Sequence, residues 1–323
     1  MPDLIKQLTS LRRGITPYGA APHKPVLLLA VIDGFRKGFL SSAEVGISME
    51  LMTSFRNIWD LLVDTKHVPN FALPFFHLGS EPSGIWELIP FTGKTIPVTK
   101  SNSIKSFRAL RETVAFAALS DELFQALSDS SQRNELEHAI LQRYFQDKAS
   151  DLARPYRLWS DCLKEEILYD PAENYARKVV RRLEQMTLPE REEEITLRGY
   201  IFKTAVLDLY DHRCSVSGLK IELPGPVRSI SMVDACHIIP FAESFDDTIT
   251  NGLALAPTLH RAFDRGLLFI SDDYRIMIHR QLKDYSPDGG IRKFEGQQLL
   301  LPPTERFHPS KERLRKHLMR FER

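Results

Sequence analysis

Three polar residues in the C-terminal third of the chain, His237, Asn251 and His260, are separated by 14 and 9 positions. The apolar stretch before His237 is typical of a strand, turn-forming residues precede Asn251, and the apolar spacing at about 256–264 favours a short helix. A strand end, a loop and a helix that each contribute one such side chain can build one compact site. This order of elements constrains the fold more than any other feature of the sequence.

Three segments around these residues resemble the HNH nuclease motif, the ββα-metal finger: His237–Pro240, Asn251–Leu253 and Leu259–Asp264. The resemblance covers about residues 198–280 and implies hydrolysis of DNA phosphodiester bonds, which needs a base for water and a cation beside the departing 3′ oxygen. It implies that His237 is the base, because an imidazole ordinarily titrates near neutral pH. It also implies that Asn251 orients the base or braces the loop, and that His260 binds a single Mg²⁺ or Mn²⁺ ion.

The position before His237 departs from this pattern, because Cys236 stands where many HNH nucleases have a metal-binding aspartate. Asp234 lies on the same face of the predicted strand as Cys236, since side chains alternate along a strand, and we expect Asp234 to be the carboxylate ligand. A thiolate ligand would favour a softer metal than Mg²⁺. Asp264, four residues after His260 on one helical face, either orients His260 or only caps the helix.

The cysteines and the apolar runs limit the compartment and the metal content. Three cysteines (Cys162, Cys214 and Cys236) are no disulfide framework, and Ser217 stands where a CxxC pair starting at Cys214 would need its second cysteine, so no structural zinc is expected. No apolar run approaches the ~18 residues of a membrane span, and the N-terminus has no signal-peptide pattern. We expect a protein of the prokaryotic cytoplasm with no membrane partner.

The start of an apolar helix near Pro25 is the most informative feature of the N-terminal half. Lys24 is the predicted helix cap and His23 precedes it, so free backbone amides and two basic side chains would form an anion site. Arg12 and Arg13 precede a flexible loop and suit phosphate contacts. The alternative is a buried helix with two solvated basic residues at its end.

Two N-terminal segments, Pro22–Ala30 and Leu73–Leu78, resemble the sulfur-binding domain of phosphorothioate-dependent HNH restriction endonucleases over about residues 1–145. That family binds DNA in which sulfur replaces one non-bridging phosphate oxygen. The resemblance implies an apolar sulfur pocket and nearby phosphate contacts from these residues: Leu73, Pro74, His77, His23 and Lys24. Family members can have an aromatic residue before the proline and a small residue three positions after it, whereas this chain has Leu73 and His77 there.

The length and the mixed pattern predict a two-domain α+β protein, with 43% hydrophobic residues to fill its cores. The N-terminal domain is expected to be mostly helical with a small sheet, including a strand at Leu73–Leu78 and a helix at 104–118. The acidic run Glu190–Glu194 is expected to be a solvated part of a helical linker. The expected limits are 1–150 for the DNA-binding domain, 151–195 for the linker and 196–323 for the ββα-metal HNH domain.

These expectations combine into a type IV-like restriction endonuclease that recognises phosphorothioated double-stranded DNA and cuts the backbone nearby. One HNH site cuts one strand, so a double-strand break implies a homodimer or two independent nicks. One alternative is an HNH enzyme that reads another mark, such as a methylated base. A second alternative is a DNA-binding regulator with an inactive HNH fold.

Overall fold

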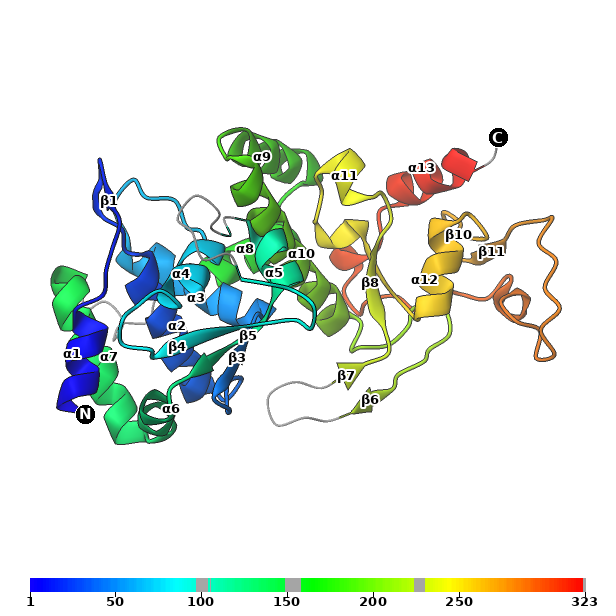
Figure 1. Cartoon of the computed structure of the whole chain (residues 1–323). Coiled ribbons are helices and arrows are strands. Elements are labelled where there is room, and N and C mark those ends of the chain that lie inside the picture. The colour runs from blue at the N-terminus through cyan, green and yellow to red at the C-terminus, as the bar shows by residue number, and fades with distance from the viewer. Residues whose placement is uncertain (97–103, 105, 149–157, 224–229, 322–323) are drawn as a thin grey trace. The chain divides into compact units, whose positions relative to one another are not determined.

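The structure is a computed structural model that describes residues 1–96, 104, 106–148, 158–223 and 230–321 (Figure 1). The fold class is α+β, as expected, with many helices and several small antiparallel sheets. The chain forms two compact units, one of residues 1–162 and 186–197 and the other of residues 163–185 and 198–323. The expected linker therefore belongs partly to each unit, and its residues 151–157 lie outside the described part of the chain.

The first unit combines helices with one three-stranded sheet in the order β3-β5-β4 and a short hairpin, β1-β2. Its helices are α1 (Pro2–Thr9), α2 (His23–Lys37), α3 (Met49–Leu62), α4 (Ala72–Leu78), α5 (Phe107–Thr113), α6 (Asp121–Ser128), α7 (Ser130–Tyr144) and the short η2 (Gln146–Lys148). Its strands are β1 (Ile15–Thr16), β2 (Gly19–Ala20), β3 (Glu44–Gly46), β4 (Trp86–Pro90) and β5 (Val114–Leu119).

Helix α2 is the centre of this unit. Every residue from Val26 to Ile32 is buried, and α2 packs against α3, α4 and α7. A helix that is apolar on all sides is stable only where neighbours cover all of its faces. Ser48 caps the adjacent α3 by accepting a hydrogen bond from the backbone N–H of Leu51 (3.2 Å), which satisfies one of the free amides of its first turn.

Two sequence-based assignments in this unit are wrong. Leu73–Leu78 is not a strand but lies in helix α4, where Asn70 accepts the N–H of Leu73 (2.9 Å) and Pro74 sits in the first turn, which needs no donor from it. The expected helix at 104–118 ends at Thr113, and the apolar run Val114–Leu119 forms β5, the central strand of the sheet. Short apolar runs are ambiguous between helix and strand, and burial between neighbours decided both cases.

The second unit contains the C-terminal half of the chain. Its helices are α8 (Trp159–Tyr169), α9 (Ala172–Glu184), α10 (Leu188–Leu209), α11 (Phe241–Ser244), α12 (Pro257–Asp264) and α13 (Lys311–Phe321), with short η4 (Ile249–Asn251), η5 (Arg292–Phe294) and η6 (Glu305–Phe307); α8 and α10 begin in the first unit. Its strands are β6 (Glu222–Leu223), β7 (Ile230–Ser231), β8 (Asp234–His237), β9 (Gly252–Leu255), β10 (Leu268–Ile270) and β11 (Ile276–Ile278). They pair as three antiparallel hairpins, β6-β7, β8-β9 and β10-β11. The helix expected at 256–264 is confirmed. The sequence also predicts a hairpin of Leu267–Ile270 and Arg275–His279, which corresponds to β10-β11. Of the strand that it predicts at Ser229–Cys236, Ser229 lies outside the described residues.

The β8-β9 pair packs tightly against α10. Gly252 is opposite His237 in the ladder. A Cβ atom at Gly252 would lie 2.6 Å from Cγ2 of Val206 and 3.2 Å from Cε2 of Phe202, both in α10. A residue without a side chain is needed at this close approach. The Asn251–Gly252 pair is therefore a packing feature of a strand start as well as a loop signal.

The acidic run Glu190–Glu194 is not a solvated linker, so that expectation is wrong. It lies in α10, and Glu193 and Glu194 are buried in the first unit. The two carboxylate oxygens of Glu193 accept the backbone N–H of Phe71 at 3.0 and 2.9 Å, and Glu194 pairs with Arg56 at 3.3 Å. An acidic helix face satisfied by internal donors has the same composition as a solvated one, so the sequence alone could not separate them.

We expect Glu193→Gln to reduce the pH dependence of stability. Burial raises the pKa of Glu193 to about 8, so the folded protein keeps a proton that the unfolded chain releases at a lower pH. The unfolded state then binds fewer protons, and the free energy of unfolding falls as the pH rises from the ordinary glutamate range to about 8, by at most about 1.4 kcal/mol per pH unit. Gln keeps a carbonyl oxygen for the Phe71 N–H and cannot ionise.

Chemical denaturation of both proteins at pH 5.5 and 8 measures this effect. The variant should gain stability relative to wild type at the higher pH. Glu192→Gln is the matched control, because Glu192 is the preceding residue and is less buried. Equal pH slopes for wild type and Glu193→Gln would contradict the prediction.

No helix in the described part of the chain has both the length and the apolar character that a membrane crossing requires.

Candidate active site

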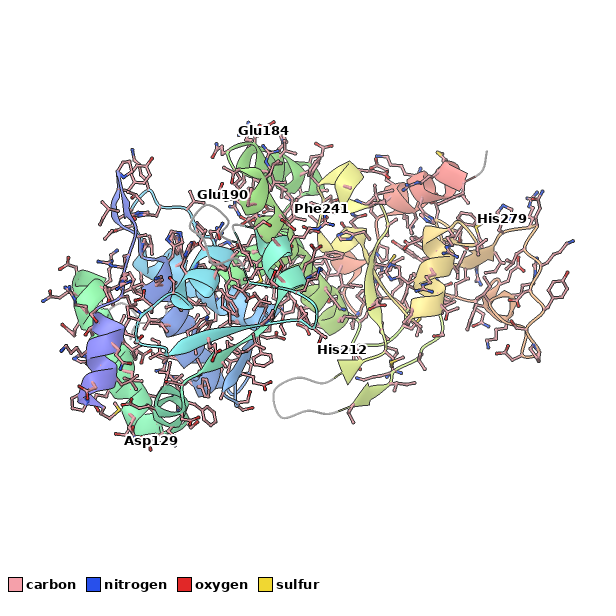
Figure 2. The ribbon with its side chains drawn as sticks, viewed as in Figure 1. Asp129, Glu184, Glu190, His212, Phe241 and His279 are labelled. Atoms are coloured by element: carbon pink, nitrogen blue, oxygen red, sulfur yellow. The ribbon has the colours of Figure 1, made fainter. Side chains whose placement is uncertain are left out.

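His237 lies at the end of β8 and has two close partners. Its Nε2 is 2.8 Å from Oδ1 of Asp247, whose side chain is only 2% exposed. Its ring stacks on Phe202 of α10, with centroids 4.0 Å apart and planes 8° from parallel. Phe241, labelled in Figure 2, lies farther away at 6.3 Å. The imidazole itself is 22% exposed, so it is held on two sides and remains open to solvent.

The contact with Asp247 determines which ring nitrogen of His237 carries the proton. A carboxylate only accepts hydrogen bonds, so Nε2 must donate and Nδ1 keeps its lone pair. Nδ1 is therefore the nitrogen that can accept a proton from water. Stacking on Phe202 prevents rotation of the ring away from this orientation.

The side-chain hydrogen bonds of Asn251 go to the loop that carries Asp247 and not to His237. Asn251 is fully buried, its Oδ1 accepts the N–H of Ile239 (2.9 Å), and its Nδ2 donates to the carbonyl oxygens of Ile239 (2.9 Å) and Asp246 (2.8 Å). All of these bonds tie the residues after β8 to the start of β9. Of the two roles that the resemblance implied, this geometry corresponds to bracing of the loop.

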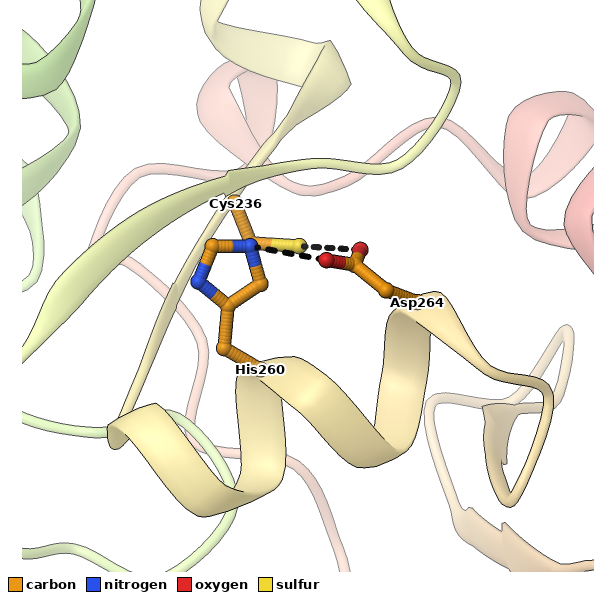
Figure 3. Close-up of side chains that lie close together, drawn as sticks. All are labelled: Cys236, His260 and Asp264. Carbon is orange, nitrogen blue, oxygen red and sulfur yellow. Dashed lines mark hydrogen bonds and ion pairs between the residues drawn. The ribbon is translucent and has the colours of Figure 1, made fainter.

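A second cluster lies beside His237 and contains Cys236, His260 and Asp264 (Figure 3). One potential ligand atom of each residue lies within 4.8 Å of the others. His260 and Asp264 project from α12 one turn apart, with Nε2 and Oδ2 separated by 3.4 Å, and Cys236 reaches from β8 with Sγ 3.8 Å from Oδ1 of Asp264. Cys236 and His237 are consecutive residues at the end of β8.

Asp234, the carboxylate ligand expected from the sequence, is not in this group of described residues. Its side chain is 42% exposed and pairs with Lys203 at 3.6 Å. The structure thus brings His260 together with Cys236 and Asp264 instead. The sequence predicts Asp264 only as a partner of His260 or a helix cap, whereas its distances to His260 and Cys236 place it among the candidate ligands.

The donor set of this cluster fits one divalent transition-metal ion. Imidazole nitrogen, carboxylate oxygen and thiolate sulfur together suit Zn²⁺ or a similar ion better than Mg²⁺, which prefers oxygen ligands. Burial, and then the charge of Asp264, raise the pKa of the Cys236 thiol well above its ordinary value. A bound cation would reverse this effect and favour the thiolate.

The basic residues at the start of α2 differ from the expected anion site. The helix begins at His23, so Lys24 lies inside the first turn and is not its cap. Lys24 forms a largely buried ion pair with Glu81, which also accepts the backbone N–H of Arg12 at 3.1 Å. The side chain of Arg12 is exposed, and the guanidinium of Arg13 lies 4.7 Å from the ring centroid of Tyr144.

His23 is packed rather than presented to solvent. Its ring centroid is 4.6 Å from that of Trp59, its Nε2 donates to the carbonyl oxygen of Val68 (3.0 Å), and burial lowers its pKa to about 4. The imidazole is therefore neutral at pH 7 and adds no charge to a phosphate site.

The expected pocket residues lie on α4. Pro74 is buried, while Leu73 and His77 are half-buried. Burial, and then the charge of Lys24, lower the pKa of His77. The structure thus leaves Leu73 and His77 partly accessible but turns Pro74 into the core.

Sequence reasoning missed Asp247, the partner of His237, and Phe202, its stacking neighbour. Two consecutive aspartates, Asp246 and Asp247, precede Asn251 in a loop, and only their burial distinguishes them from ordinary loop acids. Arg313 pairs with Asp246, which leaves Asp247 for His237. No local pattern could have indicated Phe202.

One family model matches the part of the chain that carries these residues. The family model described as HNH endonuclease (HNH_2) matches residues 214–271, which contain both clusters. One similar solved structure is described as a "Modification dependent TagI restriction endonuclease", with 24% identity, a TM-score of 0.28 and coverage of 38% of each chain. This chain therefore spans well under two thirds of the length of that protein. No curated protein matches the sequence.

Residues 214–271 thus match the HNH endonuclease family model, and in this segment a strand, a loop and a helix present the two clusters.

Proposed function

We propose that the protein is a modification-dependent restriction endonuclease that recognises phosphorothioated duplex DNA and hydrolyses a phosphodiester bond nearby. The observation that carries the nuclease part is the His237–Asp247 pair at the end of β8, with the preceding residue of the same strand, Cys236, in the Cys236–His260–Asp264 cluster. A base and a cation site are the two requirements of this hydrolysis.

In this proposal Nδ1 of His237 removes a proton from the attacking water. Asp247 holds the imidazole in the required tautomer and stabilises the imidazolium that forms. Cys236, His260 and Asp264 would hold the metal ion, which when bound supplies positive charge for the phosphate and the departing 3′ oxygen. The products would carry 5′-phosphate and 3′-hydroxyl ends.

A groove beside α12 is suited to hold the DNA backbone. Its volume is about 830 Å³, and its lining includes Arg261, Arg265, Lys283 and Tyr285. Arg261 and Arg265 each follow a cluster residue by one position along the chain. Basic side chains of these residues would position a phosphate without reading its sequence.

The phosphorothioate part of the proposal depends on the resemblance of the N-terminal segments, with the residue roles revised. Leu73 and His77 are the half-buried residues that remain available for an apolar sulfur pocket, and Lys24 with Glu81 would contribute a neutral ion pair beside it. Phosphate contacts then come from Arg12 and Arg13 rather than from His23. A double-strand break would still need a homodimer or two nicks.

We expect cleavage of phosphorothioated plasmid to exceed cleavage of unmodified plasmid of the same sequence by about 10–200-fold, the usual range for a one-group difference in an apolar pocket. Sulfur gains contact with an apolar wall, whereas a phosphate oxygen loses water there without a new donor. Leu73→Asn should reduce this ratio, and Arg12→Ala should lower cleavage of both plasmids alike. Equal cleavage of the two plasmids would remove the sulfur proposal and favour a methylated base, which the same assay tests with methylated plasmid.

A further inference from the structure

The carboxylate that holds His237 is itself held by residues from outside the matched nuclease segment. Oδ2 of Asp247 accepts a hydrogen bond from the hydroxyl of Tyr175 (3.3 Å), and that hydroxyl accepts one from Nη1 of Arg198 (3.0 Å). Tyr175 lies in α9 and Arg198 in α10, whereas the family match begins at residue 214. All four residues of this chain of contacts belong to the second compact unit.

Three of the four side chains in this series of hydrogen bonds are almost completely buried, which is unusual for polar groups. Tyr175 is 0%, Arg198 1% and Asp247 2% exposed, while His237 at the end is 22% exposed. A guanidinium and a carboxylate removed from water cost several kcal/mol each unless their bonds compensate. The polar groups therefore run from the interior to the solvent-facing imidazole, which is the only one that substrate can reach.

The direction of each hydrogen bond follows from the chemistry of the groups. Arg198 can only donate, so the Tyr175 oxygen accepts from it and the Tyr175 hydroxyl hydrogen is directed at Asp247. Asp247 then accepts from both Tyr175 and Nε2 of His237. Burial raises the pKa of Tyr175, so its hydroxyl stays a donor throughout the neutral range.

We propose that Tyr175 and Arg198 are positioning residues of the nuclease, which fix Asp247 and through it the orientation and tautomer of His237. The functional catalytic unit then includes α9 and α10 in addition to the HNH segment. This inference rests on the proposed role of His237 as the base. It predicts that a change far from DNA, at one buried hydroxyl, impairs the chemical step.

The test uses Tyr175→Phe in the full-length protein with the divalent metal that supports wild-type cleavage. Removing one hydroxyl should lower kcat by roughly 10–100-fold, the usual effect of losing a group that orients a functional side chain, with little change in KM. Asp247→Asn should be worse, up to about 10⁴-fold, because an amide N–H directed at Nε2 would move the ring proton to Nδ1. Tyr210→Phe is the matched control, since the buried Tyr210 hydroxyl has no hydrogen-bond partner among the residues that the structure describes.

A second readout does not depend on cleavage. The ¹⁵N shifts of labelled histidine, measured in neutral imidazole, report the tautomer, and His237→Ala identifies the His237 signals. Wild type and Tyr210→Phe should show the Nε2–H form, Asp247→Asn the Nδ1–H form, and Tyr175→Phe a mixture. If Tyr175→Phe does not fold, Arg198→Lys should give the same partial loss, because a flexible ammonium group does not reproduce the fixed planar geometry of the guanidinium that donates to the Tyr175 oxygen.

Wild-type kcat and an unchanged tautomer in Tyr175→Phe, or in Arg198→Lys if that variant is needed, would overturn the inference. If the proposed function itself is wrong, the result is different: His237→Ala would then retain cleavage, whatever tautomer His237 adopts in the wild-type protein.

Discussion

Replacing His237 with alanine should reduce DNA cleavage by roughly 10²–10⁴-fold, the usual contribution of a positioned general base. The loss follows from the geometry of the ring, which Asp247 and Phe202 hold with Nδ1 free. DNA binding should be retained, because the residues proposed to contact phosphate lie elsewhere in the chain. Single-turnover cleavage of a labelled duplex and a binding titration of the same duplex in chelator measure the two properties separately.

The matched control for this variant is His138→Ala, which removes an exposed imidazole from the first unit. It should cleave at the wild-type rate. Wild-type cleavage by His237→Ala with fresh metal would show that another group is the base, and a parallel loss of binding would indicate a structural effect instead.

Removal of divalent metal should abolish cleavage, and His260→Ala should weaken metal binding by more than about 100-fold, since the loss of a direct ligand exceeds the 10–100-fold effect of losing an outer partner. The reason is the position of His260 between Cys236 and Asp264, where it supplies the nitrogen of a three-residue donor set. Titration of the chelated protein with Mn²⁺, Zn²⁺ and Mg²⁺, followed by both metal binding and cleavage, measures the affinities. We expect Mg²⁺ to bind most weakly, because a thiolate and an imidazole favour softer ions.

Two further variants separate the cluster seen in the structure from the ligand expected from the sequence. Cys236→Ser should weaken binding of Zn²⁺ more than binding of Mg²⁺, and it should remove the thiolate charge-transfer absorption of the Co²⁺-loaded protein. Asp234→Asn should have little effect, because Asp234 is half-exposed and pairs with Lys203. Weaker metal binding in Asp234→Asn, together with little effect of Cys236→Ser, would show that Asp234 is the ligand. Full activity in chelator would exclude a metal-dependent mechanism.

The secondary structure was predictable where one local signal dominated. Residues 26–32 form a buried helix and 86–90 a strand because their apolar runs have clear boundaries. The run at 73–78 has aromatic residues typical of strands, yet the Asn70 cap and burial on several sides favour the helix. The acidic run at 190–194 has the composition of a solvated segment, and only the approach of the Phe71 amide and Arg56 buries part of it.

The sequence by itself determined which strand end, loop and helix carry the candidate residues His237, Asn251 and His260, because these elements follow each other closely along the chain. Short connections leave few ways to arrange such elements, so residue type and spacing were sufficient to place the three residues in one segment. The tertiary structure alone decided which groups act on them. Tyr175 hydrogen-bonds to Asp247 across 72 positions of the sequence, and Phe202 of α10 stacks on His237. Cys236 and Asp264 lie together with His260, where Asp234 was expected. Those contacts depend on how separate elements pack, and side-chain packing leaves no periodic signal in the sequence.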